Sequence, residues 1–479
     1  MTRDTFRHPW PFDWRPPWRQ TPLTWEMRSR EVNRDKNFFS VKNLKSFLRK
    51  HSLISEFRKV IPEGLECFLV GGAVRDLLLE KSPCDFDLIT PGDPTDLAQD
   101  WAKHCGGRWF WLDESRRQSR VVLRREDRQW FFDFAPYRAA SLEADLSERD
   151  FTINAMAVAL APSSEDHESI YDPCHGREDL AKGILRTCSA ESFQQDPLRV
   201  VRAARFASCL GLTMDAASAD LAAESAPKLQ AIAPERIKTE LFTLVSCENP
   251  VTGLRILGRV GAIEVIFQAN IDSVQCEQAL ARVEHLDRHL VEHSALAKQS
   301  LSEAVESGLT RQGLLRLAAL LQKLISADQV PHLARSLAFS IATGIRLQSL
   351  LRLNAEQFGN DLLTRVAGTP RALALWASTL GRDARDALLW MHFRCSDHAD
   401  IRHRLEEVWH AWDHLAEDNR ILPLLDGHQV SEMLPEGKGR EVGELLDALK
   451  QAEIEGRIEN AEDARNFLKL QVQKEIDKD

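Results

Sequence analysis

Features that would assign this 479-residue sequence to a specialised class of proteins are largely missing from it. Its nine cysteines are odd in number, scattered along the chain and without a Cys-x-x-Cys pair, which argues against a disulfide framework and a zinc finger. No apolar run is long enough to span a bilayer, and the start of the chain shows no signal-peptide pattern. We therefore expect a cytoplasmic protein with no membrane partner.

The sequence also lacks an excess of positive charge, since its formal net charge is −10. This balance does not exclude nucleic-acid binding, because binding depends on local patches and not on the total charge. Residues 1–50 are locally basic, and the segment 8–25 holds four Trp among five Pro. We expect this Pro/Trp-rich N-terminal extension to be an extended arm or a tail, in preference to an RNA contact made by stacking.

The pattern of apolar residues divides the rest of the chain into two parts. From about 51 to 188, short β-branched or aromatic runs alternate with helical signals, as at 67–70 and 85–90. Beyond about 189, apolar residues recur at helical spacing almost to the C-terminus. The chain is also too long for one typical domain. The predicted fold is therefore an α/β head followed by an all-α remainder.

A pair of glycines separates the first predicted strand from a helix. The strand ends at Gly71-Gly72, and the helix AVRDLLLE begins directly afterwards. Paired glycines let the backbone approach a ligand closely, and a helix N-terminus presents free N–H groups to an anion. Arg75, in the first helical turn, can add charge-assisted bonds to a phosphate. Taken alone, such a pair is usually just a tight turn.

Two aspartates alternate on the next predicted strand, in the run Asp85-Phe86-Asp87. Side chains at i and i+2 lie on one face of a strand, so both carboxylates point the same way. Close carboxylates repel each other unless a cation lies between them, and Mg²⁺ prefers such ligands. A metal pair here can activate a 3′-hydroxyl and stabilise the leaving pyrophosphate. Asp133, on a later strand, is a candidate third catalytic carboxylate, with a structural salt bridge as the alternative.

The segment ERDFTINAMA, residues 148–157, carries three further candidates. Arg149 and Asp150 precede what looks like a helix, and Asn154 lies one turn beyond Asp150. Asp150 has an ordinary alternative role as a helix N-cap. The functional interpretation places Arg149 on phosphates, and Asp150 with Asn154 on the ribose hydroxyls, which would select NTP over dNTP.

The segment QQDPLRVVRAARFASCLGL, residues 194–212, places cations along one helix face. Asp196 and Pro197 are typical of the N-cap and first position, and arginines then recur every three residues. An Asp and an Arg one turn apart match the Watson–Crick edge of C or A, whose amine donates and whose ring nitrogen accepts. U and G present the opposite pattern and would leave buried groups unpaired. The alternative is a solvated basic face; the residues are Asp196, Arg199, Arg202 and Arg205.

These segments, in this order, closely resemble the class II tRNA nucleotidyltransferase and bacterial poly(A) polymerase family, part of the DNA polymerase beta-like superfamily. The match covers residues from about 67 to 245 and includes PERIKTEL at 234–241, which is similar to the family's neck-stabilising motif. The resemblance implies metal ligation by Asp85 and Asp87. It also implies nucleotide contacts by Gly72, Arg75, Arg149, Asp196, Arg199, Arg202 and Arg205.

The resemblance further implies a seahorse-like arrangement of head, neck, body and tail. We expect the head at 51–188, the nucleotide-selecting neck at 189–258, and a tRNA-binding body and tail at 259–479. The implied activity is template-independent addition of C and/or A, from CTP and ATP, to the 3′ end of tRNA with Mg²⁺ as cofactor. In the tail, the loop 437–440 before a helix is either a phosphate seat or a simple connector.

Three features depart from the family pattern. Gln195 stands where an acid usually precedes the templating Asp, and Glu148 stands where a second Arg is common. The span from 132–138 to 149–152 is short, whereas full CCA-adding members often carry a longer flexible loop there. This brevity is similar to CC-adding members and favours partial addition.

Other functions remain as alternatives at this point. A poly(A) polymerase on the same fold is the nearest, although the chain has a tRNA-like tail and no basic C-terminal extension. A non-catalytic RNA-binding protein would predict a broken metal pair, whereas Asp85 and Asp87 are both present. A small-molecule nucleotidyltransferase would not need a long helical body.

Overall fold

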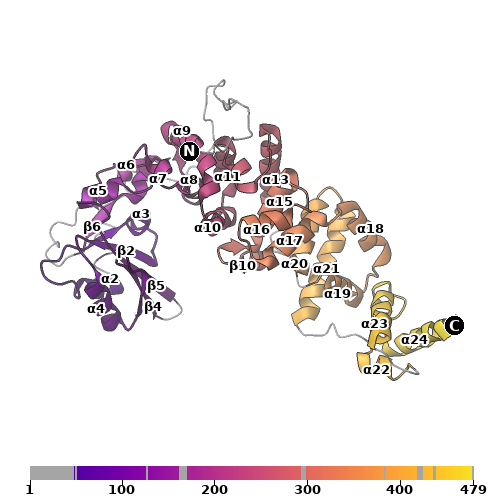
Figure 1. Ribbon diagram of the computed structural model, residues 1–479. Coiled ribbons are helices and arrows are strands. Elements are labelled where there is room, and N and C mark those ends of the chain that lie inside the picture. The colour runs from indigo at the N-terminus through magenta and orange to yellow at the C-terminus, as the bar shows by residue number, and fades with distance from the viewer. Residues whose placement is uncertain are drawn as a thin grey trace, which may run out of the picture.

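The computed structural model describes residues 48, 51–125, 128–160, 170–292, 298–381, 383–417, 424–434 and 439–476. Figure 1 shows the chain passing from an α/β head through neck helices and a helical body to a small helical tail at the C-terminus. The division into an α/β head and an all-α remainder predicted above is confirmed. The expected arm or tail at 1–50 lies outside the described residues, except for buried Leu48.

The head is built on a seven-stranded sheet with the order β3-β4-β5-β2-β1-β6-β7. Strands β2 and β5 run parallel, and the other neighbours pair antiparallel. The parallel pair lies in the middle of the sheet, where it brings two distant segments of sequence side by side. The strands are β1 (Phe68–Val70), β2 (Asp85–Thr90), β3 (Arg108–Asp113), β4 (Gln118–Arg125), β5 (Arg128–Pro136), β6 (Ala157–Ala159) and β7 (Ile170–Tyr171).

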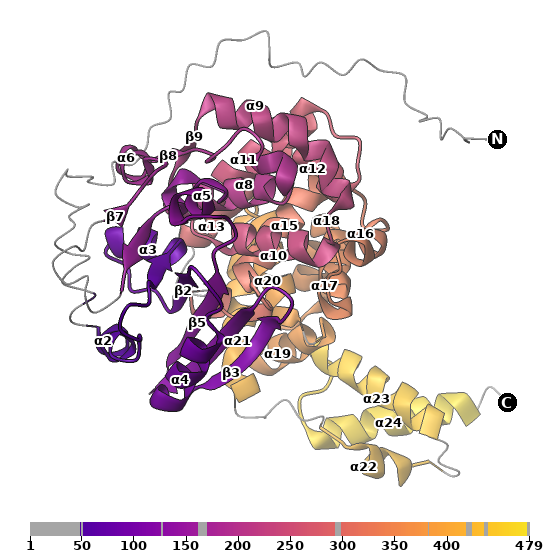
Figure 2. The ribbon, with the colours of Figure 1, turned by 60° about the vertical axis from the view of Figure 1, so that its left-hand side comes forward.

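One face of this sheet is buried, because apolar residues alternate along β2, β4 and β5 with more polar ones. Phe86, Phe132 and Phe134 are each at most 1% exposed. They lie in the same apolar core as Phe57 of α2 (Ser52–Arg58) and Trp101 of α4 (Thr95–Cys105), and Phe132 packs against both of these rings in tilted contacts. Figure 2 shows both helices beside the strands. The opposite face carries the polar residues and is the one available for a site.

Short helices follow the strands of the head, and α7 leads into the longer helix α8. Helix α3 follows β1, and a single 3₁₀ turn stands where the sequence indicated a helix after Asp150. Helix α8 begins at Arg199, two residues later than predicted, because the carboxylate of Asp196 accepts from the N–H of Leu198 across a preceding turn. The helices are α3 (Gly72–Leu78), α5 (Leu142–Ser147), η2 (Thr152–Asn154), α6 (Gly176–Lys182), α7 (Ser192–Gln195) and α8 (Arg199–Leu210).

Helices α8, α10 and α11 pack closely to form the neck. A two-stranded parallel sheet ties the start of the neck to the end of the head. Its strands lie on either side of α7 and α8 in the sequence, so the two units are joined by backbone as well as by side chains. The elements are β8 (Ile184–Leu185), β9 (Thr213–Met214), α9 (Ala216–Ser225), η4 (Ala226–Ala231), α10 (Pro234–Ser246) and α11 (Pro250–Arg259).

The body is helical apart from a small hairpin, and its apolar core is continuous with that of the neck and head. Buried Asp386 accepts from both Arg311 and Arg346, which neutralises its charge inside the bundle. The elements are α12 (Ala262–Phe267), α13 (Ser273–Glu292), α14 (Lys298–Leu301), β10 (Ala304–Glu306), β11 (Leu309–Thr310), α15 (Arg311–Leu324), α16 (Val330–Ser336), α17 (Ile341–Arg352), α18 (Ala355–Arg365), α19 (Pro370–Thr379), α20 (Ala384–Arg394) and α21 (Ala399–Glu417).

The tail has a small apolar core of its own, to which Leu425, Val430 and Leu468 belong. The loop 437–440, considered as a phosphate seat or a connector, is described only in its second half: residues 437 and 438 lie outside the described residues, and Gly439 begins α23. In the described part of the chain, no helix is long and apolar enough to cross a membrane. The tail helices are α22 (Gly427–Ser431), α23 (Gly439–Ile454) and α24 (Ala461–Ile476).

A close helix crossing in the neck gives a stability prediction. A Cβ added at Gly253 of α11 would lie 2.3 Å from the backbone oxygen of Ala204 in α8. We expect Gly253→Ala to lower the free energy of unfolding by about 1–3 kcal/mol, because backbone cannot move aside as a flexible side chain can. Urea denaturation followed by circular dichroism measures this.

The control is Gly92→Ala in the head, where an added Cβ meets nothing within 4 Å. Its effect should stay within about 0.5 kcal/mol, as for most substitutions away from packed contacts. Equal effects of the two substitutions would contradict the close packing of α8 against α11.

Candidate active site

The Gly71-Gly72 turn places backbone directly against polar side chains. Gly71 has a φ of 73°, and a Cβ there would lie 3.0 Å from Arg149 Nη1 and 3.2 Å from Asp87 Oδ2. A side chain at this position would therefore be strained and would also crowd two candidate site residues. Arg75, one helical turn further on, is 8% exposed and donates from Nη1 to Asn154 Oδ1 at 2.6 Å. The turn thus lines the site as predicted, while Arg75 is held by a second predicted site residue.

The three candidate carboxylates lie on two neighbouring strands at the centre of the sheet. Asp85 and Asp87 alternate on β2, and Asp133 of β5 is the direct neighbour of Asp87 across the parallel pair. Both oxygens of Asp133 accept from Arg120, at 2.6 and 2.7 Å. The salt bridge considered for Asp133 is thus present. A catalytic role for Asp133 remains a prediction, because its carboxylate lies beside the other two.

Within the described residues, Asp85 and Asp87 form no ion pair like that of Asp133 with Arg120. Burial raises the pKa of both carboxyls, and the charge of Asp133 adds to this, against the opposing effects of Arg120 on Asp85 and Arg149 on Asp87. Within the described chain, no hydrogen-bond donor reaches either carboxylate. Two unpaired, mutually repelling oxygen ligands fit a divalent cation whose remaining ligands are water and substrate phosphate.

No larger metal-binding cluster was found around this pair. Among the residues that the structure describes, no three or more His, Cys, Asp and Glu side chains come together as a group that could hold a metal ion. The candidate pair would thus supply two carboxylates rather than a complete cage. Magnesium sites that share the ion with substrate phosphates commonly have this composition.

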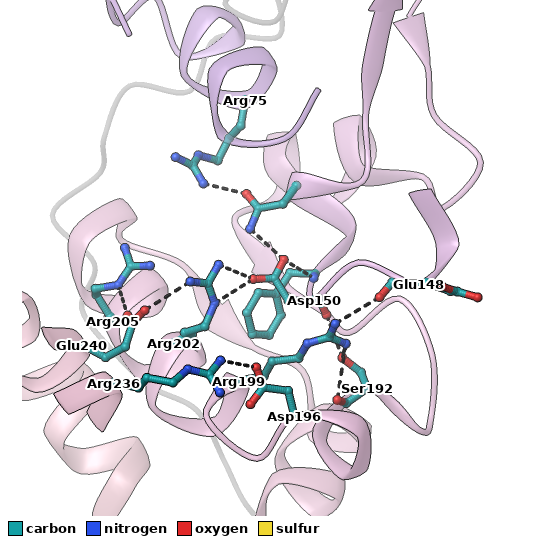
Figure 3. Close-up of polar contacts among 12 residues, drawn as sticks. Arg75, Glu148, Asp150, Ser192, Asp196, Arg199, Arg202, Arg205, Arg236 and Glu240 are labelled. Carbon is teal, nitrogen blue, oxygen red and sulfur yellow. Dashed lines mark hydrogen bonds and ion pairs between the residues drawn. The ribbon is translucent and has the colours of Figure 1, made fainter. Parts of the chain in front are cut away.

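Asp150 is the centre of a buried hydrogen-bond network (Figure 3). Its Oδ1 accepts from the N–H of Phe151 and from Asn154 Nδ2, and its Oδ2 accepts from Arg202 Nε and Nη2 at 3.0 and 2.7 Å. Burial opposes ionisation, but Arg202 and the other donors outweigh it and hold the pKa of Asp150 below its ordinary value. The N-cap alternative for Asp150 is wrong, because the following turn is a 3₁₀ turn with Phe151 at its cap.

The network continues into the neck through Glu240 of α10. Glu240 accepts from Arg202 and Arg205, so two of the arginines on α8 are tied to carboxylates rather than solvated. Phe206 lies among the guanidinium groups, with Arg75, Arg202 and Arg205 over its ring at 5.2, 5.4 and 4.1 Å. The solvated basic face considered from the sequence is therefore wrong for these residues. The cations instead surround one aromatic ring beside the site.

Asp196 and Arg199 are held by separate partners. Arg199 donates to Ser192 Oγ at 2.8 Å and to the main-chain oxygen of Glu148 at 3.1 Å. Asp196 accepts from Arg236 Nη2 at 2.7 Å. The two side chains thus do not bond to each other, and each keeps polar atoms for another partner. Because Glu148 contributes its carbonyl, this contact does not depend on the side chain at position 148.

Two adjoining hollows bring the predicted site residues together. Asp87, Arg149, Asp150 and Arg202 line both. The first hollow contains the candidates for phosphate and metal binding, and the second contains Asp196 and Arg199, the candidates for base recognition. The remaining predicted residues divide between them: Gly71, Gly72, Arg75, Asp85, Asn154 and Arg205 line the first, and Asp133, Asp196 and Arg199 line the second.

Sequence reasoning missed several residues of this site. Arg236 and Glu240 hold the predicted residues in place, and both lie in the PERIKTEL segment, where the i, i+4 spacing of an Arg and a Glu was the available signal. Arg138 lines the second hollow and acts electrostatically on Asp87. Arg120 pairs with Asp133. No local sequence pattern identifies Arg120, because its partner is set by strand pairing.

The fold and the site together define a nucleotidyltransferase with an α/β head and a helical remainder. Residues 67–186 match the family model of the Poly A polymerase head domain, and residues 211–270 match that of a probable RNA and SrmB-binding site of polymerase A. The CC-adding tRNA nucleotidyltransferase of Geobacter sulfurreducens is 33% identical over 418 residues, which cover 85% of this chain and 92% of that protein. The chain belongs to the tRNA nucleotidyltransferase family.

Other relatives agree with this family but differ in specificity. The A-adding tRNA nucleotidyltransferase of Deinococcus radiodurans is 30% identical over 441 residues, covering 84% of this chain and 94% of that protein. A solved CCA-adding enzyme in complex with CTP has a TM-score of 0.69 at 18% identity, covering 90% of this chain and 98% of that chain. The latter likeness supports the fold. Membership of the family alone does not decide which nucleotide is added.

The carboxylate pair gives a prediction about metal binding. In metal-free buffer at neutral pH, Asp87→Asn should be at least as stable as the natural protein, because it removes a buried charge that repels its neighbours. Magnesium should stabilise the natural protein, by about 2.7 kcal/mol at a hundred times its Kd. The variant should show little of this gain. Thermal unfolding with EDTA and with Mg²⁺ measures both effects.

Asp93→Asn is the matched control, because Asp93 lies in the head but accepts from Thr95 at the start of a helix. Its magnesium response should equal that of the natural protein. If magnesium stabilised the Asp87→Asn protein as much as this control, the pair would not be the metal site.

Proposed function

We propose that this protein is a template-independent RNA nucleotidyltransferase that adds C and/or A, from CTP and ATP, to the 3′ end of tRNA. The observation that carries the proposal is the uncompensated pair Asp85 and Asp87 beside the Gly71-Gly72 turn, next to a hollow lined by Asp196 and Arg199. A metal site, a phosphate-accepting turn and a base-reading pair are the three parts that such a reaction needs. Relatives named for this activity support it.

Asp85 and Asp87 are the residues that would hold Mg²⁺, which supplies activation of the attacking 3′-hydroxyl and stabilisation of the leaving pyrophosphate. Arg149 lies against the Gly71 backbone, with Nη1 3.0 Å from the position of a Cβ there, and lines both hollows. We assign it to the triphosphate. Arg205 joins it from the neck side, since its contact with Glu240 leaves other N–H groups to donate.

We assign Asp150 and Asn154 to the ribose end of the nucleotide, with a constraint from their existing contacts. Asn154 already bonds to Arg75 and Asp150 through its two polar atoms. A ribose hydroxyl would therefore share an oxygen with an existing donor or replace it. Asp150 also fixes Arg202, so its first role is to join the head to the neck.

The choice of base is assigned to Asp196 and Arg199. Asp196 accepts from the exocyclic amine of C or A, and Arg199 donates to the adjacent ring nitrogen. Arg236 holds Asp196 and Ser192 holds Arg199, so both groups are fixed before the nucleotide enters. The ion pair with Arg236 provides the positioning that the exposed Gln195 does not.

The domain roles follow from the same assignment. We propose that 51–188 is the catalytic head, that 189–258 is the nucleotide-selecting neck, and that 259–479 binds tRNA. A reducing, cytosolic location suits the nine free cysteines. The short span from 132–138 to 149–152, which contains α5, favours CC addition.

The activity is tested with tRNA transcripts that end before the first C, after one C and after two. Each receives CTP, ATP, UTP or GTP with Mg²⁺. We expect incorporation of C, or of C and A, to a fixed length, and a loss of at least about a thousandfold in Asp85→Ala, because one of two carboxylates cannot hold the metal pair. Long A tails on any RNA would identify a poly(A) polymerase. No incorporation would leave an RNA-binding protein.

Discrimination among nucleotides is tested through Arg236. In Arg236→Gln the carboxylate of Asp196 loses its ion pair, and we expect the ratio of kcat/KM for CTP over UTP to fall about tenfold, the equivalent of about 1.4 kcal/mol. Lys238→Gln, on the same helix but paired with Glu306, should leave the ratio unchanged. A lower melting temperature with an unchanged ratio would show that Arg236 acts only on stability.

A further inference from the structure

One row of side chains crosses the head sheet from its edge to the candidate metal site. Phe110 of β3 pairs with Arg120 of β4, Arg120 pairs with Asp133 of β5, and Asp133 pairs with Asp87 of β2. Directly opposite residues on neighbouring strands share a face of the sheet. Phe110 therefore lies on the same face as the carboxylates, at the far end of the row.

This face is open along β3, whereas the other face is covered. Phe110 is 43% exposed and Leu112 is 48% exposed, although both are large and apolar. On the covered side, the rings of Trp109 and Trp111 meet edge to face, and the neighbouring Val121 is fully buried. Packing within the fold therefore explains why Trp109 and Trp111 are apolar. It does not explain the exposed apolar side chains on the face that carries the candidate carboxylates.

The open face combines flat apolar groups with guanidinium groups. Arg120 lies over the ring of Phe131, with 5.0 Å between its guanidinium carbon and the ring centroid. Arg108 and Arg124 are exposed on the same face, at even spacing from Phe110 and Arg120. Aromatic rings accept stacked bases, and arginines contact the intervening phosphates; an open sheet face with this composition is typical of single-stranded RNA recognition.

The spacing of the strands sets which part of an RNA this face can meet. Three strand steps of about 4.8 Å separate Phe110 from Asp87, a distance of about 14 Å. Phe110 is thus too far away to contact the reacting 3′-hydroxyl. It can meet a base upstream of it. Leu112 lines the same hollow as Asp87 and Asp133, so the open face continues into the site without a break.

We propose that the open face of β3, β4 and β5, defined by Phe110, Leu112, Arg120 and Phe131, stacks the single-stranded 3′-terminal bases of the RNA that is being extended. The inference rests on the proposed function and assigns the RNA-binding part of the same site. The ring of Phe110 holds a base upstream of the terminal nucleotide. Arg120, while paired with Asp133, keeps N–H groups for the phosphate between them.

The test measures steady-state extension of a tRNA transcript by Phe110→Ala. Loss of one stacked base should raise the KM for the RNA on the order of tenfold and leave the KM for CTP within about twofold. Phe110→Trp, which keeps an aromatic surface, should restore the natural KM. The control is Tyr171→Ala, which removes a 40% exposed aromatic side chain from β7 at the opposite edge of the head sheet and should change neither constant.

A second set of transcripts carries one abasic residue at the last, second-last or third-last position. When the abasic residue lies at the stacked position, the KM of the natural enzyme for the RNA should rise. The KM of Phe110→Ala should not rise further, because the same contact is already lost. Additive losses at every position would overturn the proposal. A KM of Phe110→Ala for RNA equal to that of the Tyr171→Ala control would also overturn it, as would a Phe110-dependent dimer seen by light scattering.

The same transcripts separate this proposal from the proposed function. Binding of labelled RNA to the Asp85→Ala protein, followed by fluorescence anisotropy, reports stacking without catalysis. A natural enzyme that adds nucleotides normally but binds abasic and intact ends equally would overturn only the stacking surface. An enzyme that adds no nucleotide would overturn the proposed function, whatever the binding result.

Discussion

The buried carboxylate of Asp150 is the contact on which the arrangement of the site depends. It joins a residue of the head to Arg202 of the neck, and through Arg202 to Glu240 of a second neck helix. Removing one member of such a buried pair typically costs about 3–5 kcal/mol, because the other charge is left uncompensated. The same carboxylate fixes Asn154 and, through it, Arg75. Head and neck therefore hold the residues around the candidate site as one unit.

The second constraint is the lack of ion-pair partners for Asp85 and Asp87 in the described part of the chain, in contrast to the paired charge of Asp150. Asp150 and Glu240 form ion pairs with Arg202 and Arg205, whereas in the described part of the chain no donor bonds to Asp85 or Asp87, whose pKa values are raised. The carboxylates of Asp85 and Asp87 repel each other, and a cation bound between them would remove that repulsion. Asp133 lies beside the unpaired Asp85 and Asp87, but its own charge is neutralised by the ion pair with Arg120.

Local sequence was sufficient for much of the site. The i, i+2 aspartates on β2, the Gly-Gly turn before α3 and the three-residue spacing of arginines on α8 each encode a geometry within one element. Local sequence did not predict contacts between side chains on different helices or strands. Arg120 meets Asp133 only through the register of β4 with β5, and Arg236 meets Asp196 only because α10 packs beside α8.

The sequence by itself determined the α/β head, the helical remainder, the candidate pair of metal ligands and the family, because short-range periodicity and motif spacing carry that information. Tertiary structure alone decided which charges are paired, since an ion pair depends on distance in space and not along the chain. It also decided that one face of the head sheet stays open beside the carboxylates. Exposure of Phe110 follows from which helices cover the sheet, and no pattern within β3 specifies that.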